Sequence, residues 1–375
     1  MMLPRRLHTF LAITVAVLAV TYAALPTLMA ALLRHMFTAP NQIPWSGGGH
    51  LRLIDVDGMP AQVLNSVERA RELTSSSFQY HKQGDVWVVS YVKSGTTWTI
   101  GILAALVGHP AAQYAGNLQK VTRQFCPQPE LPDLGWKNDG FGHSIEELNN
   151  WPVLDIGRNN RSYRCFKSHW PSKDHVVASE DKSKYIYVLR NAQDQIMSHW
   201  NQVWGMGFHY GTENVTFEEG WDDFVQDWLD GNVENGQYFD HVASWYGRID
   251  DPNVMFVRFE DLKDNPTKII EQIALFIGMD EEGVTSNKIH DVMELTSFER
   301  MRVADEQDLG LRFMRWLGVL RKPHIRIGEV GRNVGGASSS GLKFSSKQLA
   351  ALDALYKEKL EPLGVPREWI LLQNK

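Results

Sequence analysis

The chain has 375 residues, of which 43% are hydrophobic and 22% charged. These values are typical of a globular protein and leave room for one large α/β domain or two small ones. A net charge of −6 argues against a nucleic-acid-binding protein, which usually carries a basic surface. The two cysteines, Cys126 and Cys165, are too few for a disulfide framework, and Cys165 is expected to be a small buried apolar residue in a strand.

A long apolar run opens the chain. Residues 7–33 contain no Asp, Glu, Lys or Arg, and about 20 apolar residues suffice to span a bilayer. Arg5 and Arg6 precede the run, so the positive-inside rule places the N-terminus in the cytosol. We therefore predict a cytosolic tail and a transmembrane signal anchor over residues 1–34, with the bulk of the chain in the Golgi or ER lumen (type II).

A cleaved signal peptide is the alternative, because small residues at 21–24 offer a cut site and the product would be secreted. The apolar run continues well past that site, which favours the anchor. A buried soluble helix is disfavoured, since the run shows no polar stripe. Residues 35–50 contain Pro40, Pro44 and a Gly triplet, which is typical of a stem or linker, and residues 51–375 form the remaining domain. Glycosylation sequons at Asn160 and Asn214 fit a lumenal domain.

The stretch 85–106 organises the domain. A buried strand leads through Lys93-Ser-Gly-Thr-Thr-Trp98 into a helix predicted over 97–107. Such a turn points backbone N–H groups and the positive end of the helix dipole at one spot. Lys93 adds a positive charge, while Ser94, Thr96 and Thr97 add hydroxyl donors. We interpret the loop as a phosphate cradle for a nucleotide; the alternative is an ordinary turn with a solvated Lys.

The order of this loop differs from a Walker A loop, in which the Lys directly follows the second Gly. Residues 111–160 are rich in Gly, Pro and Asn, and we expect long loops and short helices there. These loops either shape a substrate pocket or form a variable surface excursion.

The strand predicted over 163–171 ends in Lys167 and His169. Chemistry collects at the carboxyl ends of strands in open α/β sheets. An imidazole there can take a proton from a hydroxyl, because it titrates near pH 6.5. From the residue alone, His169 is either such a base or a structural histidine.

A third strand, 185–189, is followed at once by Arg190. Arg binds a phosphate dianion in a bidentate fork. Ser198 lies eight residues on, about two helical turns away and therefore on roughly the same helix face. The alternative for Arg190 is a surface ion pair with Asp194.

Further helices and one more strand follow. Helices are predicted over 217–229, 238–249 and 345–360, and the Trp residues of the first two are expected in the core. A strand over 254–259 precedes a helix that we expect to be capped by Asn265, to begin at Pro266 and to end at Gly278.

Five motifs resemble, in order, those of sulfotransferases that use 3′-phosphoadenosine 5′-phosphosulfate (PAPS). They are Lys93-Ser-Gly-Thr-Thr-Trp, Lys167-Ser-His, Arg190-Asn-x-x-Asp-x-x-x-Ser, Thr296-Ser-Phe and Arg326-x-Gly-x-x-Gly. The resemblance covers about residues 81 to 360 and is greatest to the branch that includes cytosolic small-molecule enzymes. It implies an α/β fold: a three-layer α/β/α arrangement with a central, mainly parallel sheet, similar to P-loop nucleotide-binding proteins.

The resemblance also implies roles for single residues. His169 would be the base, and Lys93 and Lys167 would lie beside the transferring group. The donor-binding set would be Lys93, Ser94, Gly95, Thr96, Thr97, Trp98, Arg190, Ser198, Phe259, Thr296, Phe298, Arg326 and Gly328. Three positions depart from the family: Val92 replaces a Pro, Phe259 a Tyr that contacts adenine, and Ile327 a Lys.

The resemblance therefore implies in-line sulfuryl transfer from PAPS to a hydroxyl or amine, without a metal. The acceptor would be a small molecule, a lipid or a carbohydrate, with no role for nucleic acid, while the oligomeric state is left open. Two alternatives are a kinase related to P-loop proteins and a catalytically silent membrane protein that keeps the fold.

Overall fold

The computed structural model describes Leu28 and residues 53–56, 59–62, 85–115, 118–131, 143–156, 161–172, 183–212, 214–316, 320–321 and 342–372. The predicted anchor (apart from Leu28), the linker, Asn160, and the segment with Arg326 and Gly328 lie outside these residues. None of the helices within the described ranges has the length and apolar character needed to cross a membrane. The predicted domain boundaries stay predictions.

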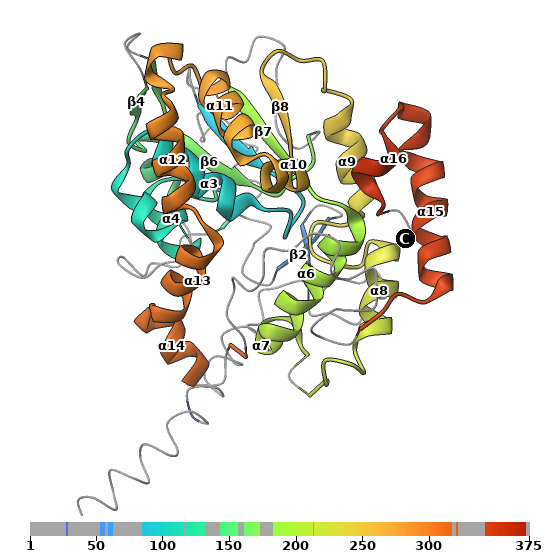
Figure 1. The fold of residues 1–375 in the computed structure, drawn as a ribbon. Coiled ribbons are helices and arrows are strands. Elements are labelled where there is room, and N and C mark those ends of the chain that lie inside the picture. The colour runs from blue at the N-terminus through green and yellow to red at the C-terminus, as the bar shows by residue number, and fades with distance from the viewer. Residues whose placement is uncertain are drawn as a thin grey trace, which may run out of the picture.

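Four parallel strands form the central sheet (Figure 1). Their order is β6 (Cys165–Ser168), β3 (Val86–Val89), β7 (Lys184–Leu189) and β8 (Val254–Arg258). Val89 lies opposite Ser168 on one side and Tyr187 on the other. This register brings the carboxyl ends of all four strands to one edge of the sheet.

Helices cover both faces of the sheet, because its short apolar strands send alternate side chains to opposite sides. Trp87 and Val89 face one hydrophobic core, while Val86 and Val88 face the other. The first core includes α6 (Ala192–Gly205), α8 (Trp221–Asp230), α9 (Tyr238–Tyr246) and α15 (Ser346–Lys359). The second includes α3 (Thr96–Leu106), η1 (Pro110–Tyr114), α4 (Leu118–Gln124), α11 (Pro266–Ile277) and α12 (Ser286–Leu295). This is the three-layer α/β/α fold predicted from the sequence.

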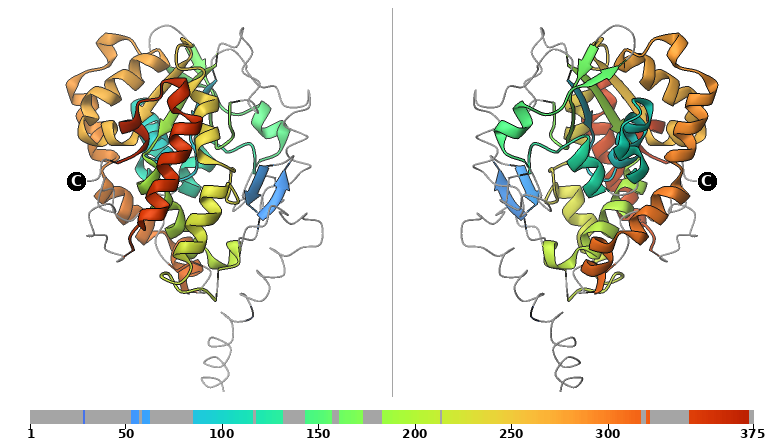
Figure 2. Two further views of the ribbon diagram at one scale, coloured as in Figure 1. Left: turned by 90° about the vertical axis from the view of Figure 1, so that its right-hand side faces the viewer. Right: turned by 90° about the vertical axis from the view of Figure 1, so that its left-hand side faces the viewer.

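Smaller elements surround these layers. Figure 2 shows the antiparallel pair β1 (Leu53–Val56) and β2 (Met59–Gln62) at an edge of the molecule, away from α11 and α12. A second antiparallel pair joins β4 (Leu154–Ile156) and β5 (Arg161–Tyr163). The remaining helices are α5 (Ile145–Asn149), α7 (Gly207–Tyr210), α10 (Phe259–Asp264), η2 (Glu281–Gly283), α13 (Phe298–Gln307), α14 (Leu309–Trp316), η3 (Glu361–Leu363) and α16 (Arg367–Ile370).

The predicted strand over 163–171 was wrong in its bounds, because the chain changes sheets at Arg164. The Arg164 guanidinium is buried and donates from Nε to Asp85 Oδ1 at 2.8 Å and from Nη1 to the Leu148 carbonyl at 3.0 Å. This buried ion pair separates β5 from β6 and ties the start of β6 to the residue that precedes β3.

The helix predicted after Asn265 forms as α11, with Pro266 in its first turn and Gly278 in a left-handed C-cap. The expected cap by the Asn265 side chain was wrong, since that side chain makes no cap hydrogen bond. The Trp residues expected in the core are buried there: Trp221, Trp228 and Trp245.

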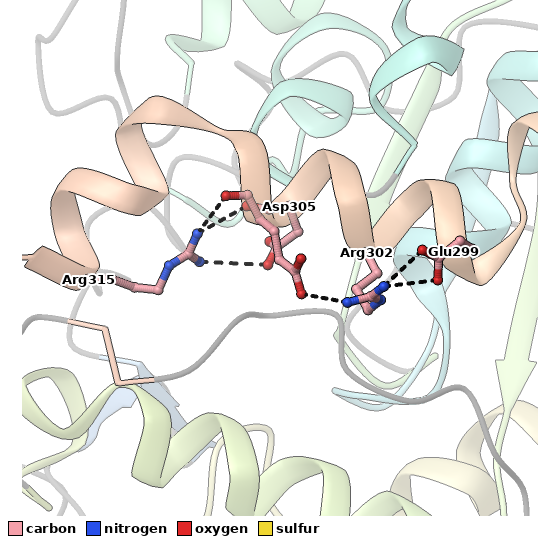
Figure 3. A network of polar contacts seen from close by, with 5 residues as sticks. Glu299, Arg302, Asp305 and Arg315 are labelled. Carbon is pink, nitrogen blue, oxygen red and sulfur yellow. Dashed lines mark hydrogen bonds and ion pairs between the residues drawn. The ribbon is translucent and has the colours of Figure 1, made fainter.

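Helices α13 and α14 are held together by charged side chains (Figure 3). Arg315 on α14 lies 3.8 Å from Asp305 Oδ2 on α13 and donates to the Asp305 carbonyl. On α13 itself, Arg302 lies between Glu299 and Glu306, at 2.8 and 2.9 Å. Polar contacts thus join α14 to α13, and α13 begins at Phe298 of the predicted donor site.

Cys126 and Cys165 form a disulfide bond between the segment after α4 and strand β6. The burial predicted for Cys165 is confirmed, but its partner was not foreseen, because pairing depends on a fold that brings the two Cα atoms to 4.6 Å. The bond bridges residues 39 apart in the sequence. It therefore restrains a long loop in the unfolded chain.

Replacing both cysteines by serine is expected to lower the free energy of unfolding by about 2–4 kcal/mol, the usual contribution of a disulfide. Urea unfolding followed by tryptophan fluorescence measures this loss. Dithiothreitol should destabilise the wild-type chain similarly and leave the double variant unchanged. Equal urea midpoints for the two proteins would contradict the bond.

Candidate active site

The loop between β3 and α3 lies at the carboxyl edge of the sheet, as predicted. Gly95 has φ +115° and Lys93 φ +62°, left-handed conformations that are uncommon outside Gly. The Val92 carbonyl accepts a hydrogen bond from Gln195 Nε2 on α6 at 2.9 Å. Ser90 and Thr96 share a hydroxyl hydrogen bond of 2.6 Å across the loop. These contacts restrain the loop, and backbone with left-handed residues of this kind is typical of anion-binding loops.

His169 follows β6 and contacts the end of β3. Its Nδ1 lies 2.8 Å from the carbonyl oxygen of Ser90. A carbonyl only accepts hydrogen bonds, so this contact places a proton on Nδ1 of the neutral ring. Nε2 then keeps a free lone pair, which is the form that a general base requires.

Burial keeps this imidazole neutral. Desolvation lowers the pKa of His169 well below its ordinary value, and the nearby charges of Lys167 and Lys93 lower it further, along with His241. The Ser90 carbonyl opposes this shift by stabilising the charged ring. Both predicted lysines thus act electrostatically on this ring.

Lys167 is buried, and its Nζ donates to Gln128 Oε1 at 2.9 Å. Burial lowers the pKa of Lys167 to about 8, while the charges of Glu130 and Glu234 raise it. The ammonium therefore stays mostly protonated at neutral pH in a site where water screens it little.

Arg190 leaves the carboxyl end of β7 beside the loop. Its Nη1 donates to the Lys93 carbonyl at 3.3 Å, and its guanidinium carbon lies 4.4 Å from the centre of the Phe259 ring. The buried Nε atom has no hydrogen-bond partner. A buried donor without a partner is costly, and an anionic group of a ligand would satisfy it.

Three aromatic rings of the predicted donor-binding set meet at this edge. Trp98 lies 5.6 Å from Phe259 and 5.0 Å from Phe298, measured between ring centres. They come from α3, α10 and α13, which are far apart in the sequence. Trp98 is partly buried against the second core, and its Nε1 has no hydrogen-bond partner.

Two further predicted residues have less distinctive surroundings. Thr296 caps the C-terminal end of α12; it is buried, and its hydroxyl donates to the Val292 carbonyl at 2.8 Å. Ser198 is partly buried on α6, seven residues after the Asn191 N-cap of that helix. The described residues contain no group of three or more His, Cys, Asp or Glu side chains able to hold a metal ion.

Several supporting residues were not predicted. Glu260 accepts from the backbone N–H and the side-chain amide of Asn191, at 3.0 and 2.6 Å, and so holds the residue after Arg190. Gln195 and Ser90 act similarly on the loop and on His169. Ser90 follows a predicted strand directly, so its position was a usable signal; the side-chain partners of Gln195 and Glu260 were not readable from spacing.

The sulfotransferase domain model matches residues 83–364 of this chain. The chain belongs to the sulfotransferase family. Mouse sulfotransferase 1B1 is 29% identical over 289 residues, which cover 74% of this chain and 83% of that protein. Rat sulfotransferase 1A1 is 30% identical over 220 residues, 58% of this chain and 67% of that protein.

Solved structures agree in fold. Mouse sulfotransferase SULT7A1 complexed with PAP has 25% identity and a TM-score of 0.59, covering 82% of this chain and 95% of that one. A retinol dehydratase in complex with retinol and PAP has 16% identity and a TM-score of 0.63, covering 85% and 92%. Family membership makes the protein a PAPS-dependent sulfotransferase, as the motifs predicted, and disfavours the kinase alternative. The left-handed loop and the unpartnered Arg190 Nε fit an anionic donor.

Gly95→Ala tests the loop. An added Cβ would lie 2.8 Å from the Phe259 ring, and φ +115° strains any side-chain-bearing residue. We expect at least a tenfold loss of affinity for the desulfonated nucleotide, equivalent to about 1.4 kcal/mol, measured by isothermal titration calorimetry. Gly205→Ala is the matched control, because its Cβ meets nothing within 4 Å. Equal affinities for the two variants would contradict the role of Gly95.

Proposed function

We propose that this sulfotransferase moves the sulfuryl group of PAPS by in-line displacement to a hydroxyl or amine, with His169 as the general base. The hydrogen bond between His169 Nδ1 and the Ser90 carbonyl carries this proposal. It selects the tautomer whose Nε2 accepts a proton. The acceptor oxygen or nitrogen forms a bond to sulfur while the bond from sulfur to the phosphate oxygen breaks. The acceptor proton passes to Nε2, and the desulfonated nucleotide leaves.

Lys93 and Lys167 are proposed to stabilise the charge that develops on the sulfuryl and leaving oxygens. Fixed positive groups in a site with little water stabilise a transition state without reorganisation. The lowering effect of both lysines on the pKa of His169 supports their nearness to the reacting centre. The side chain of Lys167 is also buried and oriented by Gln128.

The donor nucleotide is proposed to lie along the loop, with its 3′-phosphate on Arg190 and Ser198 and its base beside Trp98, Phe259 and Phe298. The free Nε of Arg190 supports the phosphate contact. Phe259 packs against Trp98 but carries no hydroxyl to donate to the base. The second phosphate contact, from Arg326 and Gly328, and the effect of Ile327 stay predictions that rest on the family motif alone.

We further propose that the domain faces the Golgi or ER lumen behind an anchor at residues 7–33, and that it takes a small-molecule, lipid or carbohydrate acceptor. The Cys126–Cys165 disulfide supports this location, because such bonds persist in oxidising compartments. The sequon residue Asn214 is exposed and accessible to glycosylation. Alkaline extraction of membranes tests the anchor: we expect the chain in the pellet. Recovery of a shortened chain from the culture medium would indicate signal-peptide cleavage instead.

His169→Ala is expected to lower kcat by about 10²–10⁴-fold, the usual contribution of a general base. Binding of the desulfonated nucleotide should change little, since the loop and Arg190 are intact. Transfer of labelled sulfate from PAPS over a panel of acceptors measures the first effect, and calorimetry the second.

His290→Ala, on the exposed side of α12, is the matched control and should behave as wild type. Near-normal turnover by His169→Ala would show that another group takes the proton. Absence of transfer by the wild-type chain, with the nucleotide still bound, would support the catalytically silent alternative.

A further inference from the structure

A short segment between α4 and α5, residues 126–130, runs beside β6 and the residues that follow it. Cys126 is bonded to Cys165. The Pro127 carbonyl accepts from the Lys167 backbone N–H at 2.9 Å, and the Gln128 side chain accepts from Lys167 Nζ. We call residues 126–130 the brace segment. It contacts Lys167 in β6 and His169 just after the strand, from outside the central sheet.

Glu130 ends the brace segment and is 4% exposed. Its Oε1 accepts from the Ser168 hydroxyl and, at 3.3 Å, from the His169 backbone N–H. The Ser168 hydroxyl in turn accepts from the Trp170 N–H at 3.1 Å. One carboxylate oxygen therefore holds the turn at residues 168–170, which carries the His169 side chain. The other oxygen, Oε2, is buried without a hydrogen-bond partner.

This carboxylate also balances the charge of Lys167. Among the described groups that act on Lys167, Glu130 and Glu234 favour the ammonium and burial opposes it. Burial raises the pKa of Glu130 itself, while the Ser168 hydrogen bond and the Lys167 charge lower it. The pKa of His169 is lowered in turn by Lys167, His241 and Lys93. The charges of the acid, the ammonium and the imidazole are thus interdependent.

We propose that Glu130 is a positioning residue for sulfuryl transfer, which orients His169 through Ser168 and keeps Lys167 charged. This inference rests on the proposed function, because it assigns a task to the support of the two residues that perform it. Glu130 touches neither substrate in this proposal. It acts through two separable properties, its hydrogen bonds and its negative charge.

Two substitutions separate these properties. Glu130→Gln keeps an oxygen that accepts from Ser168 and His169 but removes the charge. Ser168→Ala keeps the charge but removes the hydroxyl that links Glu130 to the turn. Glu146→Gln, on the exposed face of α5, is the matched control for loss of one carboxylate. Each variant is checked for folding by circular dichroism and for nucleotide binding by calorimetry.

The measurement is kcat/KM against pH, which reports ionisations of the free enzyme. Lys167 acts as the ammonium, so wild-type activity should be present below its pKa of about 8 and be lost as pH rises through it. The negative charge of Glu130 raises the pKa of the Lys167 ammonium against the effect of burial. Glu130→Gln should therefore move this loss of activity to lower pH.

Ser168→Ala should instead lower kcat at all pH values, by about 10-fold to 100-fold, because small displacements of a reacting group cost that much. Its alkaline loss of activity should stay near that of wild type. Glu130→Asp, which restores the charge, should recover the wild-type pH profile at least in part. Lys167→Arg identifies the ionisation, since its alkaline loss of activity should disappear.

If Glu130→Gln folds and matches the Glu146→Gln control in both kcat and pH profile, the inference is overturned while the proposed function stands. A uniform fall in kcat with an unmoved alkaline loss would also overturn the role of the charge. If Glu130→Gln fails to fold, Ser168→Ala still tests the role of Glu130 in orienting His169. Glu130→Asp then tests the role of its charge. A wild-type chain that transfers no sulfate from PAPS would refute the proposed function itself.

Discussion

The hydrogen bond from His169 Nδ1 to the Ser90 carbonyl is the contact on which the site depends. It joins the residue after β6 to the residue after β3, and it exists only because these strands are parallel neighbours in the observed register. A shift of register would separate the carbonyl from the ring and remove the reason for the proton to stay on Nδ1. The same edge of the sheet also carries Arg190 at the end of β7 and Phe259 after β8. The register of β3 and β6 therefore determines which nitrogen of His169 carries the proton.

Burial sets the charges of this centre. A solvated imidazole would be partly protonated near neutrality, whereas desolvation and two neighbouring ammonium groups keep His169 neutral. The same desolvation lowers the pKa of Lys167, and the charges of its acidic neighbours oppose that shift. Nearby carboxylates therefore help a neutral imidazole and a charged lysine to share one dry site. Glu130 and Glu234, from separate loops, satisfy that condition.

Support for the reacting residues comes from elements outside the central sheet. Gln195 on α6 holds the loop, Glu260 on α10 holds Asn191, and the brace segment holds Lys167 and the turn at His169. The disulfide ties the start of the brace segment to β6. The other supports are hydrogen bonds to backbone or to side chains at the site. Together they restrict the motion of the groups that we propose to carry out the transfer, and catalysis depends closely on such geometry.

Local sequence patterns were enough to predict the features that depend only on residues close together in the sequence. The strand, small-residue loop and helix over 85–106 follow from residue order alone, as do the helix start at Pro266 and its end at Gly278. The motif residues Lys93, Lys167, His169 and Arg190 were named for the same reason. Each lies at or just beyond a strand end, which an alternating apolar run makes visible.

Tertiary structure decided the pairings between distant segments. No spacing in the sequence indicates that Cys126 meets Cys165, that Arg164 is buried on Asp85, or that Glu130 accepts from Ser168. These contacts depend on how layers pack and on which groups lose water, both of which involve the whole domain. The sequence by itself determined which chemical groups the protein has and where its strands end. Only the folded chain decided which of them lie together and, through burial, which carry a charge.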